Sequence, residues 1–139
     1  MSRKKSNFTG NLIATLIVFS LIAMVGFYNA FANQKDMHTS SKFEGPKANT
    51  GTVVHSKEGK NNVLTLSNDF VVPETPDPHW QIVDSKGNVY LLNRLKIKDD
   101  KYNQRIVLPS YIKDVAKVQI WCAWAEVVLG EAAFEKPLS

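Results

Sequence analysis

The sequence predicts one small all-β domain, an antiparallel β-sandwich or barrel-like fold, preceded by an N-terminal signal or anchor helix. Two observations support this prediction. Short runs of β-branched and aliphatic residues recur about every ten residues between turn signals, which is the spacing typical of a sandwich or barrel. A single long apolar stretch follows a basic N-terminus. With 139 residues, the chain is long enough for one domain and too short for two comfortable ones.

Residues 1–32 have the three parts of a secretory signal peptide. A basic start at residues 3–5 precedes an almost wholly apolar stretch at residues 12–27. Ala30 and Ala32 then supply the small side chains that a signal peptidase requires. We therefore expect cleavage before Asn33.

An uncleaved membrane anchor is the alternative interpretation of the same residues. A helix needs about 20 apolar residues to span the hydrocarbon, and residues 12–32 nearly supply them. In both interpretations the basic start holds the N-terminus in the cytoplasm, so the rest of the chain crosses the membrane. We expect the domain to be extracytoplasmic: periplasmic, secreted, or membrane-anchored with the domain outside.

The net charge of +4 does not indicate a nucleic-acid-binding protein. Three of the 17 Lys and Arg residues lie in the first five positions, and the remainder nearly balance the 13 Asp and Glu residues. Those later charges are scattered and mixed in sign, and they form no basic stripe interleaved with aromatic residues. We therefore expect no nucleic-acid partner.

The expected elements follow in chain order. Residues 33–42 are polar and indicate a flexible spacer, and the β domain is expected at residues 43–137. Residues 85–88 are expected to form a hairpin turn because Gly87 and Asn88 tolerate positive φ. Helix evidence is limited to one turn within residues 109–115. The predicted strands are residues 52–54, 63–66, 80–83, 89–92, 95–97, 105–108, 118–122 and 126–129.

Cys122 is the first candidate for chemistry. Side chains alternate along a strand, so Val118, Ile120 and Cys122 should share one face, with Trp121 on the other. A free cysteine most often packs as a small buried hydrophobe, and this is the simplest interpretation. A lone thiol in an exported protein, however, also indicates a reactive thiol or an intermolecular disulfide.

The second candidate is the loop of residues 72–79 with the strand that follows it. The loop is rich in proline and acidic residues, and it ends with Asp77 and His79 beside Trp80. These three residues, together with Trp121, are the candidate binding residues. We expect no metal site, because the three histidines are scattered, and no hydrolase site, because no nucleophile elbow is present.

The ordered set of short motifs in this chain resembles the DM-thirteen, or electron-transfer DM-thirteen, domain family. The resemblance covers about residues 42–135. It is carried by Phe43-Glu44-Gly45, Thr50-Gly51-Thr52-Val53, Leu64-Thr65-Leu66 with Asp69-Phe70, Pro76-Asp77, Ile106-Val107-Leu108-Pro109 with Val115 and Val118, Ile120-Trp121-Cys122, Gly130, and Ala132-Ala133-Phe134.

The resemblance implies an extracytoplasmic all-β domain whose single cysteine is its hallmark. It implies a redox role for Cys122, either as a bare thiol or as a ligand of a prosthetic group such as haem. A redox partner would be a separate chain. One departure concerns a histidine that many members carry shortly before the glycine matching Gly51. Here that stretch is residues 47–50, without histidine, and His55 lies four residues after Gly51.

Two hypotheses stay open from the sequence. The first is a redox or electron-transfer module acting through Cys122, and the second is a non-catalytic module that binds a cell-surface ligand through loop 72–79. The chain is not expected to be an enzyme on its own. No Lys, Arg or His lies within three residues of Cys122 to activate the thiol, so activation would have to come from another strand.

Overall fold

A computed structural model describes residues 37–139, and within them the protein is all-β, with strands and turns and no helix. The predicted signal or anchor and the start of the predicted spacer lie outside the described residues. In residues 37–139 no helix is long and apolar enough to cross a membrane. The strands are β1 (His38–Thr39), β2 (Val53–Glu58), β3 (Asn61–Leu66), β4 (Pro78–Val83), β5 (Val89–Arg94), β6 (Lys96–Lys98), β7 (Lys101–Tyr102), β8 (Arg105–Val107), β9 (Val115–Cys122) and β10 (Val127–Leu138).

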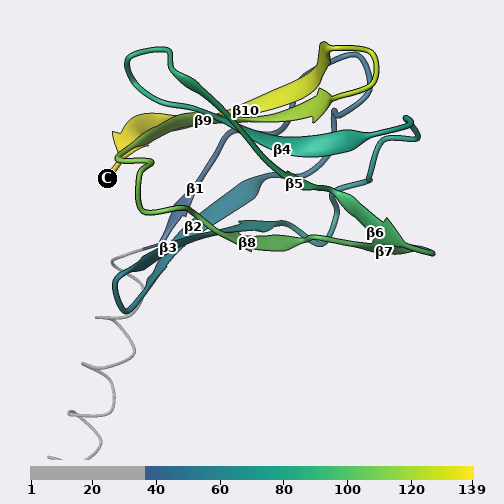
Figure 1. The fold of residues 1–139 in the computed structure, drawn as a ribbon. Helices are drawn as coiled ribbons and strands as arrows, with labels where there is room; N and C mark the ends of the chain where they lie inside the picture. The colour runs from purple at the N-terminus through teal and green to yellow at the C-terminus, as the bar shows by residue number, and fades with distance from the viewer. Residues whose placement is uncertain (1–36) are drawn as a thin grey trace, which may run out of the picture. The chain divides into compact units, whose positions relative to one another are not determined.

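Two antiparallel four-stranded sheets form the domain, and they lie one above the other in Figure 1. One sheet has the order β1-β2-β3-β8 and the other has the order β10-β9-β4-β5. The short strands β6 and β7 follow β5 in the chain and form a separate two-stranded sheet. Every predicted strand overlaps an observed one, so the prediction of an antiparallel β domain is confirmed for residues 37–139.

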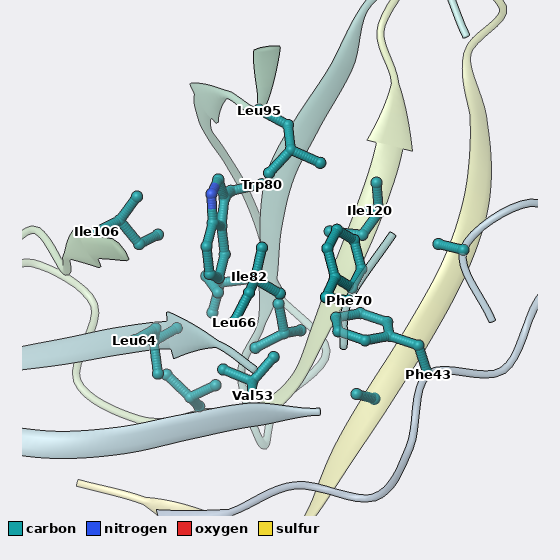
Figure 2. Close-up of a cluster of buried hydrophobic side chains, with 14 of the residues drawn as sticks. Phe43, Val53, Leu64, Leu66, Phe70, Trp80, Ile82, Leu95, Ile106 and Ile120 are labelled. Carbon is teal, nitrogen blue, oxygen red and sulfur yellow. The ribbon is translucent and has the colours of Figure 1, made fainter. Parts of the chain in front are cut away.

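The core lies between the two sheets and follows from strand alternation. Trp80 and Ile82 of β4 and Ile120 of β9 point from one sheet, and Leu64 and Leu66 of β3 point from the other (Figure 2). All five side chains are at most 1% exposed. Burying each such side chain contributes about 1.5–3 kcal/mol, so this interior is the main source of stability.

The predicted spacer continues into the folded domain, which differs from the expectation for residues 33–42. β1 pairs with β2 in the register His38↔His55, and Ser40 is buried. The Oγ of Ser40 accepts the N–H of Val53 at 2.8 Å. The polar composition that predicted a loop therefore reflects an edge strand, in which side chains face water while the backbone pairs.

The segment before β2 crosses close over β10, and this contact depends on two glycines. A Cβ on Gly130 would lie 1.9 Å from the carbonyl oxygen of Ala48, and one on Gly45 would lie 2.3 Å from the Cα of Gly130. The backbones therefore approach so closely that only glycine fits at either place. This contact fastens the segment before β2 to the β10 edge of the other sheet.

The predicted turn at residues 85–88 joins β4 to β5. Gly87 has a φ of +84°, and Val83 pairs with Val89 across the hairpin. The prediction of a turn with positive φ at Gly87 is confirmed. The single turn expected within residues 109–115 is a short bend at residues 110–111, where the N–H of Ile112 donates to the carbonyl of Pro109.

Candidate functional site

Cys122 is the last residue of β9 and faces the core. Val118, Ile120 and Cys122 are all buried on the inner face, as strand alternation predicts, and Cys122 is only 1% exposed. The thiol therefore packs in the hydrophobic interior at the end of the sheet. The polar groups around its sulfur decide whether Cys122 is only a small buried apolar residue or also a reactive thiol.

The turn after Cys122 directs backbone donors at its sulfur. Residues 123–126 join β9 to β10, and Glu126 closes the turn with a φ of +56° and an N–H that donates to the carbonyl of Cys122 at 2.8 Å. The N–H of Ala125 donates to the Sγ of Cys122 at 3.4 Å. Cys122 thus takes the position of a capping residue, whose side chain accepts the N–H three residues later.

The predicted binding loop meets the cysteine from the other side. Pro78 of β4 is the register partner of Cys122, and the N–H of Ala123 donates to the carbonyl of Asp77 at 2.9 Å. Within residues 37–139, the Oγ1 of Thr75 is the one buried side-chain polar atom without a hydrogen-bond partner of ordinary geometry. The hydroxyl of Thr75 is also among the groups that lower the pKa of Cys122. The structure therefore joins the two candidate regions of the sequence in one place.

These donors favour the thiolate of Cys122. The backbone N–H of Ala125 has the largest effect, and together with the backbones of Asp77 and Trp124 and the hydroxyl of Thr75 it holds the pKa of Cys122 below its ordinary value of 9.0. Burial acts in the opposite direction and raises the pKa. The activation that the flanking sequence lacks comes from backbone dipoles and a loop hydroxyl rather than from a charged neighbour.

Three of the four candidate binding residues lie together on the outer face of the β10-β9-β4-β5 sheet. His79 of β4 pairs in register with Arg94 of β5 and with Trp121 of β9, so these three form one cross-strand row. The carboxylate of Asp77 stands at its end, 2.9 Å from the Nε of Arg94 and 3.2 Å from the Nε2 of His79. The Nδ1 of His79 lies 2.9 Å from the carbonyl of Leu92, which orients the ring.

Trp80 is not part of this row, because it points to the opposite face of β4. Its side chain is 0% exposed, and its Nε1–H donates to the carbonyl of Asn103 at 2.8 Å. The structure therefore places Trp80 in the core, where it supports the fold and offers no surface for a ligand. Trp124 lies outside the strand, because β9 ends at Cys122, and its side chain is 75% exposed in the turn.

A second polar row runs beside the first on the same outer face. Gln81 donates to Gln119 at 2.7 Å, and Gln119 donates to Glu131 at 3.0 Å. Lys117 completes the row with an ion pair to Glu131 at 3.1 Å. The hydrogen bond from Gln119, followed by that from Lys117, holds the pKa of Glu131 below its ordinary value. This face is a fixed array of hydrogen-bonding groups beside a tryptophan.

Sequence reasoning missed Thr75, Ala125 and Arg94. Thr75 and Ala125 act through an enclosed hydroxyl and a backbone N–H, neither of which leaves a residue-type signal. Arg94 meets Asp77 through the pairing of β4 with β5, in which Arg94 is the register partner of His79. No group of three or more His, Cys, Asp or Glu side chains converges as metal ligands within residues 37–139.

A haem does not fit at Cys122 as the described residues are arranged. Thiolate ligation requires a sulfur that faces an open space for the macrocycle. The sulfur of Cys122 is instead enclosed, with Ala125, Trp124 and Thr75 as its polar neighbours. We therefore derive no chemistry through a haem.

Comparisons with known proteins leave the resemblance to the DM-thirteen family as a prediction. No family model, no characterised protein and no solved structure matches the chain.

Proposed function

We propose that this chain is a thiol redox module of DM-thirteen type that acts outside the cytoplasm through Cys122. The observation that carries the proposal is the arrangement of backbone and hydroxyl donors around a buried sulfur, which lowers the pKa of Cys122 against the effect of burial. A purely structural cysteine needs no such donors, because a thiol packs well among apolar side chains without them. The basic and apolar N-terminus supports the proposed location.

The proposed chemistry is thiol–disulfide exchange with a separate protein. The Sγ thiolate of Cys122 attacks one sulfur of a disulfide in the partner and forms a mixed disulfide. The S–S bond of the partner breaks, and its second sulfur leaves as a thiolate that takes the electron pair. Cys122 is thereby oxidised and the leaving sulfur reduced, and a thiol of the partner can reverse the step. With one cysteine the chain transfers no disulfide alone, which agrees with a module that needs another chain.

Access to the sulfur depends on the turn at residues 123–126 and the loop around Thr75. Both are surface segments: Trp124 is 75% exposed, and Thr75 lies on the loop before β4. Local opening of such segments requires much less free energy than global unfolding. We therefore expect Cys122 to react slowly but without denaturation.

The test is modification of Cys122 in the native full chain, at several pH values, with a denatured sample as reference. We expect labelling by a small disulfide probe, oxidised glutathione, at a rate faster than global unfolding. The rate should rise with pH around a midpoint below that of the denatured sample. If labelling occurs only at the rate of global unfolding, Cys122 is a structural residue and the proposal fails.

Thr75→Val provides a matched variant, since it removes the hydroxyl and keeps the shape of the side chain. We expect the midpoint for Cys122 labelling to move upward, because the hydroxyl of Thr75 is one of the groups that lower the pKa of Cys122. Thr65→Val on β3 serves as the control and should leave the midpoint unchanged. An unchanged midpoint in Thr75→Val would show that the hydroxyl of Thr75 does not affect the pKa of Cys122.

The outer face of the sheet favours a second candidate function, the binding of a cell-surface ligand. The row of Arg94, His79 and Trp121, with Asp77 at its end, combines an aromatic ring with several fixed polar groups. Such a surface suits a ligand with apolar ring faces and many hydroxyl groups, such as an oligosaccharide.

An oligosaccharide array probed with the full chain tests this candidate. We expect Trp121→Ala and Asp77→Asn each to weaken binding at least about tenfold, the loss of about 1.4 kcal/mol. Trp124→Ala should bind like the wild type, because Trp124 lies in the turn and outside the row. Absence of binding by the wild type, or equal losses in all three variants, would remove this candidate. Neither result would bear on the labelling of Cys122.

A further inference from the structure

Two of the three histidines, which the sequence places 17 residues apart, face each other across the edge of the β1-β2-β3-β8 sheet. His38 of β1 and His55 of β2 are register partners. Their Nδ1 atoms lie 3.3 Å apart, and the rings are stacked with centroids 5.5 Å apart and an angle of 30° between their planes. His55 is 2% exposed, whereas His38 lies at the surface.

The hydrogen bond on the far side of His55 orients its ring. The Nε2 of His55 lies 2.8 Å from the Oδ1 of Asn62, so Nε2 carries the proton and donates it to that oxygen. In the neutral ring of His55, Nδ1 is then an acceptor that faces the Nδ1 of His38. With both rings neutral, the two Nδ1 atoms share one N–H···N hydrogen bond, with His38 as the donor.

We propose that the two Nδ1 atoms form a binding site for a divalent transition metal ion that favours imidazole, in the order Cu²⁺ before Ni²⁺ and Zn²⁺. Two imidazole nitrogens each about 2.0–2.1 Å from one metal ion, at a tetrahedral angle, are about 3.3–3.4 Å apart. The Nδ1 atoms of His38 and His55 are 3.3 Å apart, which agrees with this metal-bound separation. The backbone pairing of β1 with β2 therefore already holds the two donors at the spacing that a metal ion needs.

Asn62 supplies what a metal-bound histidine ordinarily has, a hydrogen-bond acceptor on its other ring nitrogen that fixes the tautomer and the ring orientation. Binding requires only that the proton of neutral His38 moves from Nδ1 to Nε2, which can donate it to water because His38 is exposed. The step releases no net proton. The remaining coordination positions are open to water or to a donor from another molecule, through the exposed side of His38.

The experiment is a calorimetric titration of the full chain with Cu²⁺, Ni²⁺ and Zn²⁺ in turn, together with NMR of the imidazole nitrogens. We expect one ion per chain, tightest for Cu²⁺, and a change confined to the Nδ1 atoms of His38 and His55. His38→Ala should weaken binding by more than tenfold. This variant changes an exposed side chain on an edge strand, so it keeps the fold.

Three further variants separate a metal site from a merely structural pair. Asn62→Leu should weaken binding about 10–100-fold, the usual effect of removing the partner of a ligating histidine. His79→Ala and Cys122→Ala are the controls, and both should bind like the wild type. If His38→Ala binds as tightly as the wild type, or if His79→Ala loses binding equally, the ions bind elsewhere and the proposal is wrong.

Discussion

Asp84 shows how much one carboxylate can organise within a single turn. Its Oδ1 accepts the N–H of Lys86 at 2.9 Å and the N–H of Asn88 at 2.8 Å. Its Oδ2 accepts the side-chain amide of Asn88 at 2.9 Å and the hydroxyl of Tyr90 at 3.2 Å. The side-chain hydrogen bond from Asn88 has the largest effect and, with the others, holds the pKa of Asp84 below its ordinary value of 3.8, although burial opposes this.

The pH dependence of stability follows from the direction of that shift. Because the folded-state pKa is lowered, the stabilisation by Asp84 is fully present above about 3.8 and is lost as the pH falls through the lower folded-state value. We expect Asp84→Asn to lower the urea midpoint at neutral pH and to reduce the acid-dependent part of the stability loss. Urea unfolding at several pH values measures this, with the exposed Asp100→Asn as control. Parallel pH curves for the wild type and Asp84→Asn would contradict it.

At the scale of elements, β10 is held from two directions. It pairs with β9 along the β10-β9-β4-β5 sheet, and on its free edge it accepts the chain before β2, with Glu44 bridged to Glu131. The N–H groups of Lys47 and Ala48 donate to the carbonyl of Leu129 at 3.0 and 2.8 Å. These bonds continue the sheet over the bulge between Val128 and Gly130 and cover an edge that would otherwise be open.

Gly130→Ala should release this covering segment. The added Cβ would lie 1.9 Å from the carbonyl oxygen of Ala48, so one backbone must move and its hydrogen bonds must lengthen. We expect a loss of about 1–3 kcal/mol or more in the free energy of unfolding, measured by denaturant titration. Ala133→Val on the exposed face of the same strand should change it by about 0.5 kcal/mol or less. Equal stability of Gly130→Ala and the wild type would show that the segment before β2 can move away from β10 without loss of stability.

Across the whole molecule, the fold was predictable to the extent that local pattern determines it. The spacing of apolar runs located the longer strands, and alternation placed Cys122 inward with Val118 and Ile120. The pairing of β4 with β9, and of β3 with β8, joins residues that are distant in the sequence, and no local pattern encodes it. β1 was missed because two polar residues show no periodicity.

The candidate site was predictable only in part, for the same reason. Alternation also separates Trp80 from His79 and Gln81, but sequence reasoning grouped Trp80 with the loop because they are adjacent in the chain. The meeting of loop 72–79 with Cys122 and the contact of His38 with His55 both depend on strand pairing. Residue types therefore indicated which side chains carry chemistry, and the sheet order determined which of them meet.

The sheet order also has a consequence for the way the chain folds as it emerges from a ribosome or a translocation channel. Each sheet contains a strand that comes late in the sequence. β8 lies at the edge of one sheet, and β9 lies between β4 and β10 in the other. The β10-β9-β4-β5 sheet therefore lacks the strand between β4 and β10 until about residue 120 has emerged, when Ile120 can pair beside Trp80. Because such non-local pairings form late, we expect a chain that has emerged only as far as β5 to lack both complete sheets. Folding of residues 37–139 is thus coupled to the emergence of β9 and β10.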